Sequence, residues 1–128
     1  MKLIFNLLII IFITNQTLSA DWERWRGPNG NGIWNGPEIS QKLPKAGLKR
    51  IWRTKINPGY SGVTFSNERV YLMDKQIDEE GTAYERVVCL NAHTGYIIWK
   101  FLYPVHYKDM GYGKGPRASV LIHKLSLI

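Results

Sequence analysis

The chain has 128 residues, 17 of them basic and 10 acidic, so its formal net charge is +7 at pH 7. The length suits a single domain, and the scattered basic residues contain no run of five like charges, which argues against a nucleic-acid-binding tail and any nucleic-acid partner. One cysteine, Cys89, excludes an intramolecular disulfide.

Residues 1–20 are expected to be a signal peptide. Lys2 precedes an apolar run from Leu3 to Ile13, and small residues end the segment at Ala20. The run is too short to cross a bilayer core of about 30 Å as a helix. Because Asp21, and not a cysteine, follows the expected cleavage point, we predict an exported chain, periplasmic or secreted, that is not a lipoprotein. No stable membrane span should remain after cleavage; an uncleaved anchor is the alternative.

Residues 21–47 are predicted to be an extended lead-in segment. They are rich in glycine, show little periodicity and are expected to be held in place by Trp22, Trp25 and Trp34. The stretch RGPNGNG superficially resembles a phosphate-binding glycine loop. That mechanism needs a strand before the loop and a helix after it, and neither is indicated here. Turns are therefore the expected structure.

Strands are expected to dominate from residue 48 onward. Short runs of β-branched and aromatic residues alternate with turn residues, and no convincing helical period occurs after the leader. The mature domain is therefore predicted to be all-β. The expected strands are LKRIWRTKI (48–56), SGVTFS (61–66), RVYLMDKQ (69–76), ERVVCLN (85–91) and YIIWKFLY (96–103).

The cysteine and the acidic cluster are predicted to have structural roles. Cys89 lies inside an apolar strand, so we expect it to be buried as a small apolar side chain. Asp78, Glu79 and Glu80 are expected at a solvated hairpin tip, since calcium needs more oxygens at a defined spacing. The three histidines lie far apart in the sequence. No metal site is predicted.

The stretch LNAHTGYIIW is predicted to be a hairpin turn followed by a packing anchor. Asn91, and more weakly Thr94, can accept hydrogen bonds from turn amides, and Gly95 can adopt the left-handed conformation. Trp99 then lies on the following strand, where it could dock between two sheets. Trp52 is expected in a similar strand context 47 residues earlier, a spacing within the range of propeller repeats.

ERVVCLNAHTGYIIWKF resembles the repeat of the PQQ-like β-propellers, whose blades carry Ala-x-Asp-x-x-Thr-Gly-x-x-x-Trp. Mapped onto this repeat, the chain offers Leu90, Asn91, Ala92, Thr94, Gly95 and Trp99, with Asn91 standing where aspartate is commoner. DWERWRGPNGNG and YPVHYKDMGYGKGPRAS are similar to the exported bacterial subfamily described as BamB-like. The resemblance covers residues 21 to about 119.

The resemblance implies a partial β-propeller. Such rings have roughly seven or eight four-stranded blades, and this chain offers about one complete blade with flanking strands. We therefore expect an N-terminal fragment, with truncated propeller blades at residues 48–128. A truncation, a frameshift and a split gene are all open. An isolated blade lacks neighbours, so missing blades or self-association should be needed for stability.

The implied function is a noncatalytic scaffold or binding module at the cell envelope, with an envelope protein or a glycan as partner. The alternative is the N-terminal piece of an alcohol or sugar dehydrogenase that uses pyrroloquinoline quinone and calcium. A vicinal cysteine pair, often found beside that quinone, is impossible with Cys89 alone. We assign no catalytic residue and expect no cofactor in this segment; whether the chain is an enzyme is left open.

Polar residues near the end of the repeat are the remaining site candidates. Arg117 is expected to begin an innermost strand, where it could bind an anion or a quinone carboxylate; a structural salt bridge is the alternative. Tyr107, Asp109 and Tyr112 lie in the link between blades and, with Arg117, are candidates for partner binding. The alternative for this link is a rim loop that packs on the lead-in.

Overall fold

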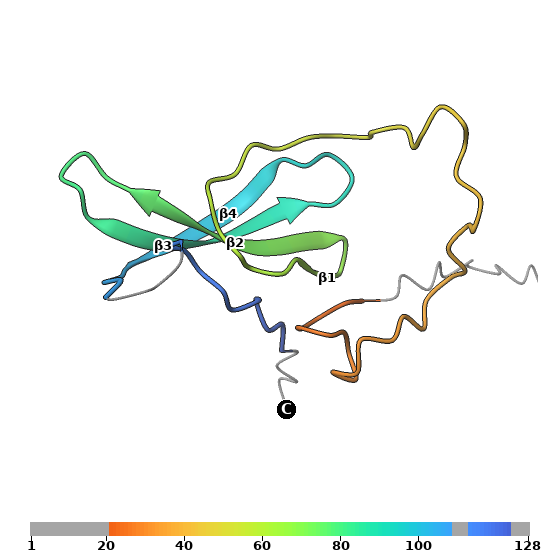
Figure 1. The fold of residues 1–128 in the computed structure, drawn as a ribbon, viewed down its shortest axis with the longest axis horizontal. Coiled ribbons are helices and arrows are strands. Elements are labelled where there is room, and N and C mark those ends of the chain that lie inside the picture. Colours follow the sequence, from red (N-terminus) through yellow and green to blue (C-terminus); the bar gives the residue numbers. More distant parts are fainter. Residues whose placement is uncertain (1–20, 109–112, 124–128) are drawn as a thin grey trace, which may run out of the picture.

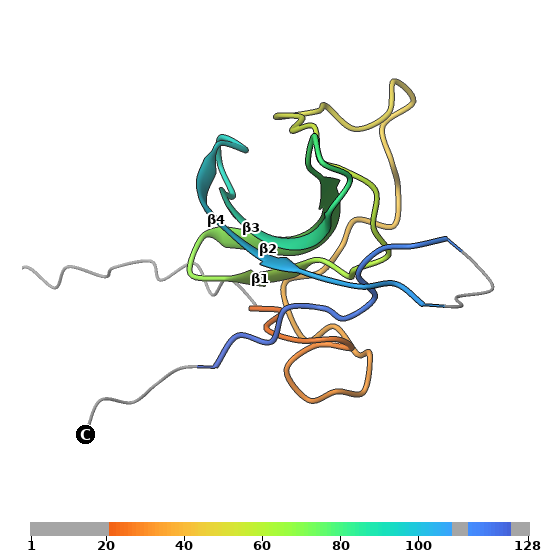
Figure 2. The ribbon, with the colours of Figure 1, turned by 90° about the vertical axis from the view of Figure 1, so that its left-hand side faces the viewer.

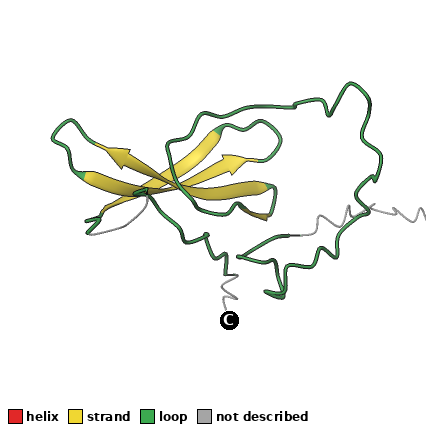
Figure 3. Ribbon diagram, viewed as in Figure 1, coloured by secondary structure: helices red, strands yellow, loops and turns green. Residues whose placement is uncertain are grey.

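The computed structural model describes residues 21–108 and 113–123, and this part of the chain is all-β. Four antiparallel strands form one sheet in chain order: β1 (Thr64–Ser66), β2 (Arg69–Ile77), β3 (Ala83–Asn91) and β4 (Ile97–Pro104). Figure 1 shows the strands crossing with a strong twist, and Figure 3 shows only strands and loops. The described residues thus contain no helix that could cross a membrane.

Strands β2, β3 and β4 confirm the runs expected at 69–76, 85–91 and 96–103. Their long antiparallel ladders pair Arg69–Ile77 with Ala83–Asn91, and Tyr84–Leu90 with Ile97–Pro104. A bulge at Cys89/Leu90 interrupts the second ladder. Bulges increase the local twist of a sheet. Figure 2 shows the resulting curvature, in which β3 and β4 bend around a concave face.

Two of the hairpin turns follow from their residues. Asn67 and Glu68 connect β1 to β2 with φ values of 50° and 59°, the positive pair that a two-residue hairpin loop needs. Between β2 and β3, the carboxylate of Asp78 accepts hydrogen bonds from the amides of Glu80 (3.1 Å) and Thr82 (2.8 Å). The acidic group is therefore a hairpin tip, as expected.

The β3–β4 turn has the conformation that its sequence predicts. Asn91 Oδ1 accepts hydrogen bonds from the amides of His93 (2.9 Å) and Thr94 (3.0 Å). Gly95 has a φ of 72°, and its amide donates to the Asn91 carbonyl at 2.8 Å. The left-handed glycine and the asparagine acceptor are confirmed.

The main hydrophobic cluster lies on one face of the sheet, while Met73 and Cys89 are buried on the other. Leu72, Val88 and Leu90 are buried in the main cluster, and Trp52 and Val70 pack against them. The Trp52 indole also donates a hydrogen bond to the Ala92 carbonyl at 2.7 Å. A segment outside the sheet therefore covers the core and binds to the β3–β4 turn.

The predicted strand at 48–56 is wrong. This segment has no strand structure; the side chains of Trp52 and Thr54 attach it to the β3–β4 turn, Thr54 through a 2.6 Å hydrogen bond to the Gly95 carbonyl. Trp52 therefore does not share the strand context of Trp99. The run at 61–66 is also shorter than expected, because only Thr64–Ser66 pair with β2. In both segments the β propensity is real but the chain lacks a strand partner.

The lead-in segment meets the sheet at β1. Trp22 forms an antiparallel bridge with Phe65, with N–O distances of 2.8 and 3.0 Å. The Trp22 and Trp34 rings lie 6.1 Å apart, whereas Trp25 is 68% exposed. The Ile122 amide bonds to the Glu23 carbonyl at 2.9 Å, so the two ends of the described chain lie side by side (Figures 1 and 2).

Gly95→Ala should weaken the β3–β4 hairpin more than Gly81→Ala weakens the β2–β3 hairpin. Both glycines have positive φ, but a Cβ at Gly95 would lie 2.5 Å from Trp52 Cε3, whereas Gly81 has nothing within 4 Å. We expect Gly95→Ala to lower the local stability by about 3 kcal/mol and Gly81→Ala by about 1 kcal/mol. Both variants strain the backbone, but only at Gly95 does the new Cβ also clash with a neighbour. Native-state hydrogen exchange measures both, and equal losses would contradict the packing of Trp52 on this turn.

Candidate functional site

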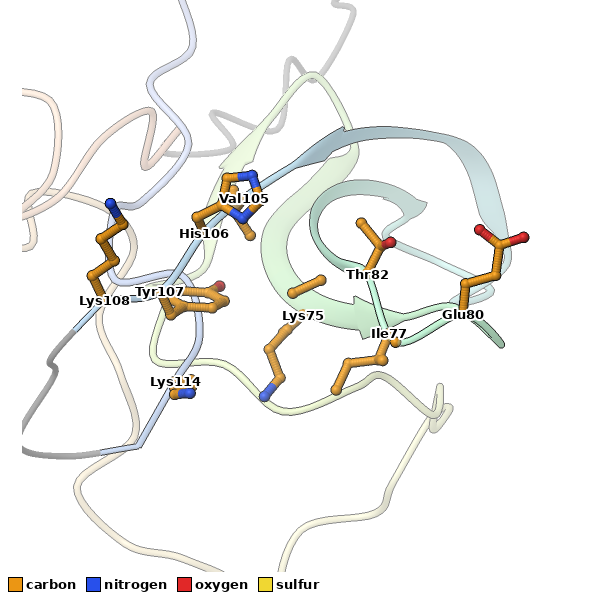
Figure 4. Close-up of a pocket in the computed structure, with 11 residues that line it drawn as sticks. Lys75, Ile77, Glu80, Thr82, Val105, His106, Tyr107, Lys108 and Lys114 are labelled. Carbon is orange, nitrogen blue, oxygen red and sulfur yellow. The ribbon is translucent and has the colours of Figure 1, made fainter.

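The end of the sheet that carries the β2–β3 hairpin is hollowed. A cavity of about 550 Å³ lies between this hairpin and the chain that follows β4. Figure 4 shows its side chains projecting from these segments. The lining residues are Lys75, Ile77, Glu80, Gly81, Thr82, Ala83, Val105, His106, Tyr107, Lys108 and Lys114.

One wall of the cavity is fixed by Glu85. Its two carboxylate oxygens accept hydrogen bonds from the Tyr103 hydroxyl at 2.6 Å and the Tyr107 hydroxyl at 2.9 Å. Glu85 and Tyr103 are cross-strand partners in the β3–β4 ladder, which places them on one face. The Val105 amide bonds to the Ala83 carbonyl at 2.9 Å and extends the pairing beyond β4. Residues 105–107 are thereby held against the hairpin.

These contacts raise the pKa of both tyrosines. Burial is the largest cause, followed by the hydrogen bond to Glu85 and the negative charge of that carboxylate; each pKa reaches about 12. The phenols are therefore neutral donors at physiological pH. Tyr107 lines the cavity, and its hydrogen bond to Glu85 indicates a structural role there.

The opposite face carries a buried ion pair that the sequence analysis missed. Asp74 is fully buried, and its two oxygens accept hydrogen bonds from Arg86 Nε at 2.8 Å and Nη2 at 2.5 Å. The backbone amide of Asn57 also donates a hydrogen bond to Asp74 Oδ2 at 2.7 Å. The hydrogen bond to Asp74 is the main cause that raises the Arg86 pKa. The sequence signal that could have indicated this ion pair is an acidic residue within one apolar strand and an arginine within the next.

Of the predicted partner-binding residues, Tyr107 and Arg117 lie in the described part of the chain. Tyr107 lines the cavity, whereas Arg117 donates hydrogen bonds to the carbonyls of Gly115 (3.1 Å) and Gly113 (2.6 Å) and lies 5.3 Å from the Tyr60 ring centroid. Asp109 and Tyr112 lie outside the described residues.

The expected innermost strand at Arg117 is wrong for this structure. Residues 113–123 have no strand structure and run beside residues 58–62. The Tyr60 amide bonds to the Pro116 carbonyl at 2.9 Å, and the Gly62 amide bonds to Ser119 Oγ at 3.1 Å. These isolated contacts do not continue as a ladder. A strand forms only where a neighbouring edge pairs residue after residue.

The residues of the repeat motif separate into two groups. Asn91, Thr94 and Gly95 meet in the β3–β4 turn, whereas Trp99 lies on β4 with 41% of its surface exposed. The Trp99 ring centroid is 6.0 Å from that of Tyr71. Docking of Trp99 against a second sheet stays a prediction.

Cys89 is buried, as expected for a small apolar residue in the sheet. Burial is the main cause that raises the pKa of its thiol. Because the thiolate is the nucleophilic form, this environment disfavours a reactive role. In the part of the chain that the structure describes, no three histidine, cysteine or acidic side chains are placed to hold a metal ion.

Comparison with known proteins identifies no relative: no family model matches the sequence, and no curated protein or solved structure matches it.

Asp74→Ala should lower the free energy of unfolding by about 3–5 kcal/mol, because it leaves the Arg86 guanidinium in a largely buried position without its partner. The combined change Asp74→Leu and Arg86→Met should recover much of this loss, since it removes both charges. Native-state hydrogen exchange in β2 and β3 provides the measurement.

The exposed pair of His93 and Glu68 is the matched control. Its atoms are 3.5 Å apart, and both side chains are at least 70% exposed. His93→Gln should cost less than about 1 kcal/mol. A cost for Asp74→Ala as small as this would show that Asp74 does not anchor the sheet face.

Alkali should weaken the fold as Tyr103 and Tyr107 ionise. Their folded pKa values of about 12 lie above the ordinary 10.0. Between these values the unfolded chain loses phenol protons that the folded chain keeps, so stability falls as pH rises; below pH 10 the contribution is complete. Ultraviolet titration of tyrosinate should show both groups ionising earlier in Glu85→Gln. An unchanged titration would exclude Glu85 as a cause of the shift.

Proposed function

We propose that this chain supplies a blade of an exported PQQ-like β-propeller that serves as a noncatalytic scaffold or binding module at the cell envelope. The observation that carries the proposal is an exposed aromatic row on β4. Trp99 and Phe101 are 41% and 61% exposed, and both lie on β4, the last strand of a four-stranded antiparallel meander. An envelope protein or a glycan is the proposed partner of the assembled propeller.

The strand order supports the assignment to a blade. A propeller blade is a four-stranded sheet, and β1 to β4 are antiparallel neighbours in chain order. The turn before β4 contains the asparagine, threonine and left-handed glycine expected from the repeat. Each feature occurs in other folds, so the combination with Trp99 is what favours a propeller.

Exposed apolar side chains on β4 support packing against a second sheet. Trp99, Phe101 and Tyr103 lie on one face, because alternate strand residues share a face. The ring centroids of Phe101 and Tyr103 are 6.3 Å apart. Ile97 and Ile98 add exposed surface near the start of the strand. Burial of such surface stabilises by roughly 25 cal/mol per Å², so a neighbouring sheet would complete a core that the single sheet leaves open.

The placement of reactive residue types supports a noncatalytic role. Cys89 is buried, Asp74 is bonded to Arg86, and Arg117 bonds to backbone carbonyls. Each of these side chains is therefore either buried or bonded to another part of the fold. The candidate surfaces for binding a partner are the hairpin end of the sheet and the exposed side of β4.

The purified chain should self-associate reversibly, and Trp99→Ser or Phe101→Ser should weaken the association. The reason is that these aromatic side chains present apolar area which a second sheet can bury. Sedimentation equilibrium at several concentrations measures the change, and Trp25→Ser is a matched control, since Trp25 is 68% exposed but lies in the lead-in.

A monomer at all concentrations with a sharp two-state melt would contradict the blade proposal. Titration with pyrroloquinoline quinone, with and without calcium, tests the noncatalytic part separately. Stoichiometric binding tighter than about 10 μM, or roughly 7 kcal/mol, that Lys75→Gln leaves unchanged would favour a dehydrogenase, since binding in the lysine-lined cavity should be weakened by that change.

A further inference from the structure

The cavity beside the β2–β3 hairpin brings together three lysines from separate parts of the chain. Lys75 belongs to β2, Lys108 follows β4, and Lys114 belongs to the last described segment. In the view of Figure 4, Lys75 and Lys114 lie below Tyr107 and His106 lies above it. Four basic side chains thus line a single cavity of about 550 Å³.

Among the side chains that line this cavity, positive charge exceeds negative charge. Glu80 is the carboxylate among the lining residues, and Glu85 lies behind Tyr107 with both oxygens bonded to tyrosyl hydroxyls. Even with Glu85 included, three lysines oppose two carboxylates. Within residues 21–108 and 113–123, no ion pair involves any of these lysines. An excess of positive charge among the lining side chains attracts anions.

The walls are apolar and partly fixed. Ile77, Ala83 and Val105 contribute hydrocarbon surface, and Val105 is bonded through its backbone amide to Ala83. Tyr107 is held by Glu85. Ligand sites typically combine apolar walls with a few polar groups that set orientation.

We propose that this cavity binds a small organic polyanion with carboxylate or phosphate groups. Lysine ammonium groups donate hydrogen bonds to anionic oxygens, and the apolar wall accommodates the organic body of the ligand. All the groups involved belong to this chain. The site is therefore independent of the proposed role as a propeller blade and needs no second sheet.

Calorimetric titration of the full-length chain tests the site with citrate and pyrophosphate as probes and acetate as the singly charged comparison. We expect saturable binding of citrate, pyrophosphate or both, and much weaker binding of acetate. The relative affinities for citrate and pyrophosphate show whether the site prefers carboxylate or phosphate groups. Lys75→Gln and Lys114→Gln should each weaken binding by roughly threefold to tenfold, and added salt should weaken it further.

Lys45→Gln is the matched control, because Lys45 is an exposed lysine of the lead-in, away from the cavity lining. It should leave the affinity unchanged. Lys114 is exposed, so its variant should keep the fold, and Lys75→Arg should retain binding through its charge. Absence of saturable binding, equal affinity for acetate, or equal weakening by Lys45→Gln would overturn the proposal.

Discussion

The contact of Trp52 with the β3–β4 turn is the interaction on which the small core depends. Its ring packs on Leu72, Val88 and Leu90 from outside the sheet, while its indole binds the Ala92 carbonyl. The close approach requires a residue without a Cβ at Gly95. One tryptophan therefore couples the turn conformation to the covering of the sheet face, where burial of apolar area stabilises the fold.

A second fixed point holds the same covering segment farther along the sheet. There the Asn57 amide reaches Asp74, which is paired with Arg86. A buried ion pair is costly to desolvate, so its three hydrogen bonds matter more for geometry than for net stability. The pair sets where the chain crosses the sheet before it enters β1. The Trp52 contact and this ion pair together define the path of residues 52–58.

The two faces of the sheet differ in how complete their packing is. One face is covered by the chain's own segment 52–58, whereas the face with Trp99 and Phe101 retains exposed aromatic surface along β4. This asymmetry connects the blade proposal with the cavity proposal. Apolar surface on β4 favours another sheet, while the lysine-lined hollow at the hairpin end favours a small anion. The aromatic row runs along β4 and the hollow lies at the hairpin end; they adjoin at Tyr103, which follows Phe101 in the row and bonds to Glu85 behind the cavity.

The sequence by itself determined the all-β class, strands β2 to β4, the acidic hairpin tip and the left-handed Gly95. These features follow from local alternation and turn chemistry, which act over a few residues. Only the tertiary structure decided that 48–56 crosses a face instead of pairing, that Asp74 meets Arg86, and that three distant lysines share a cavity. Such outcomes depend on ladder register and on the paths of long loops. Both are set by contacts between residues far apart in the chain, which local patterns do not encode.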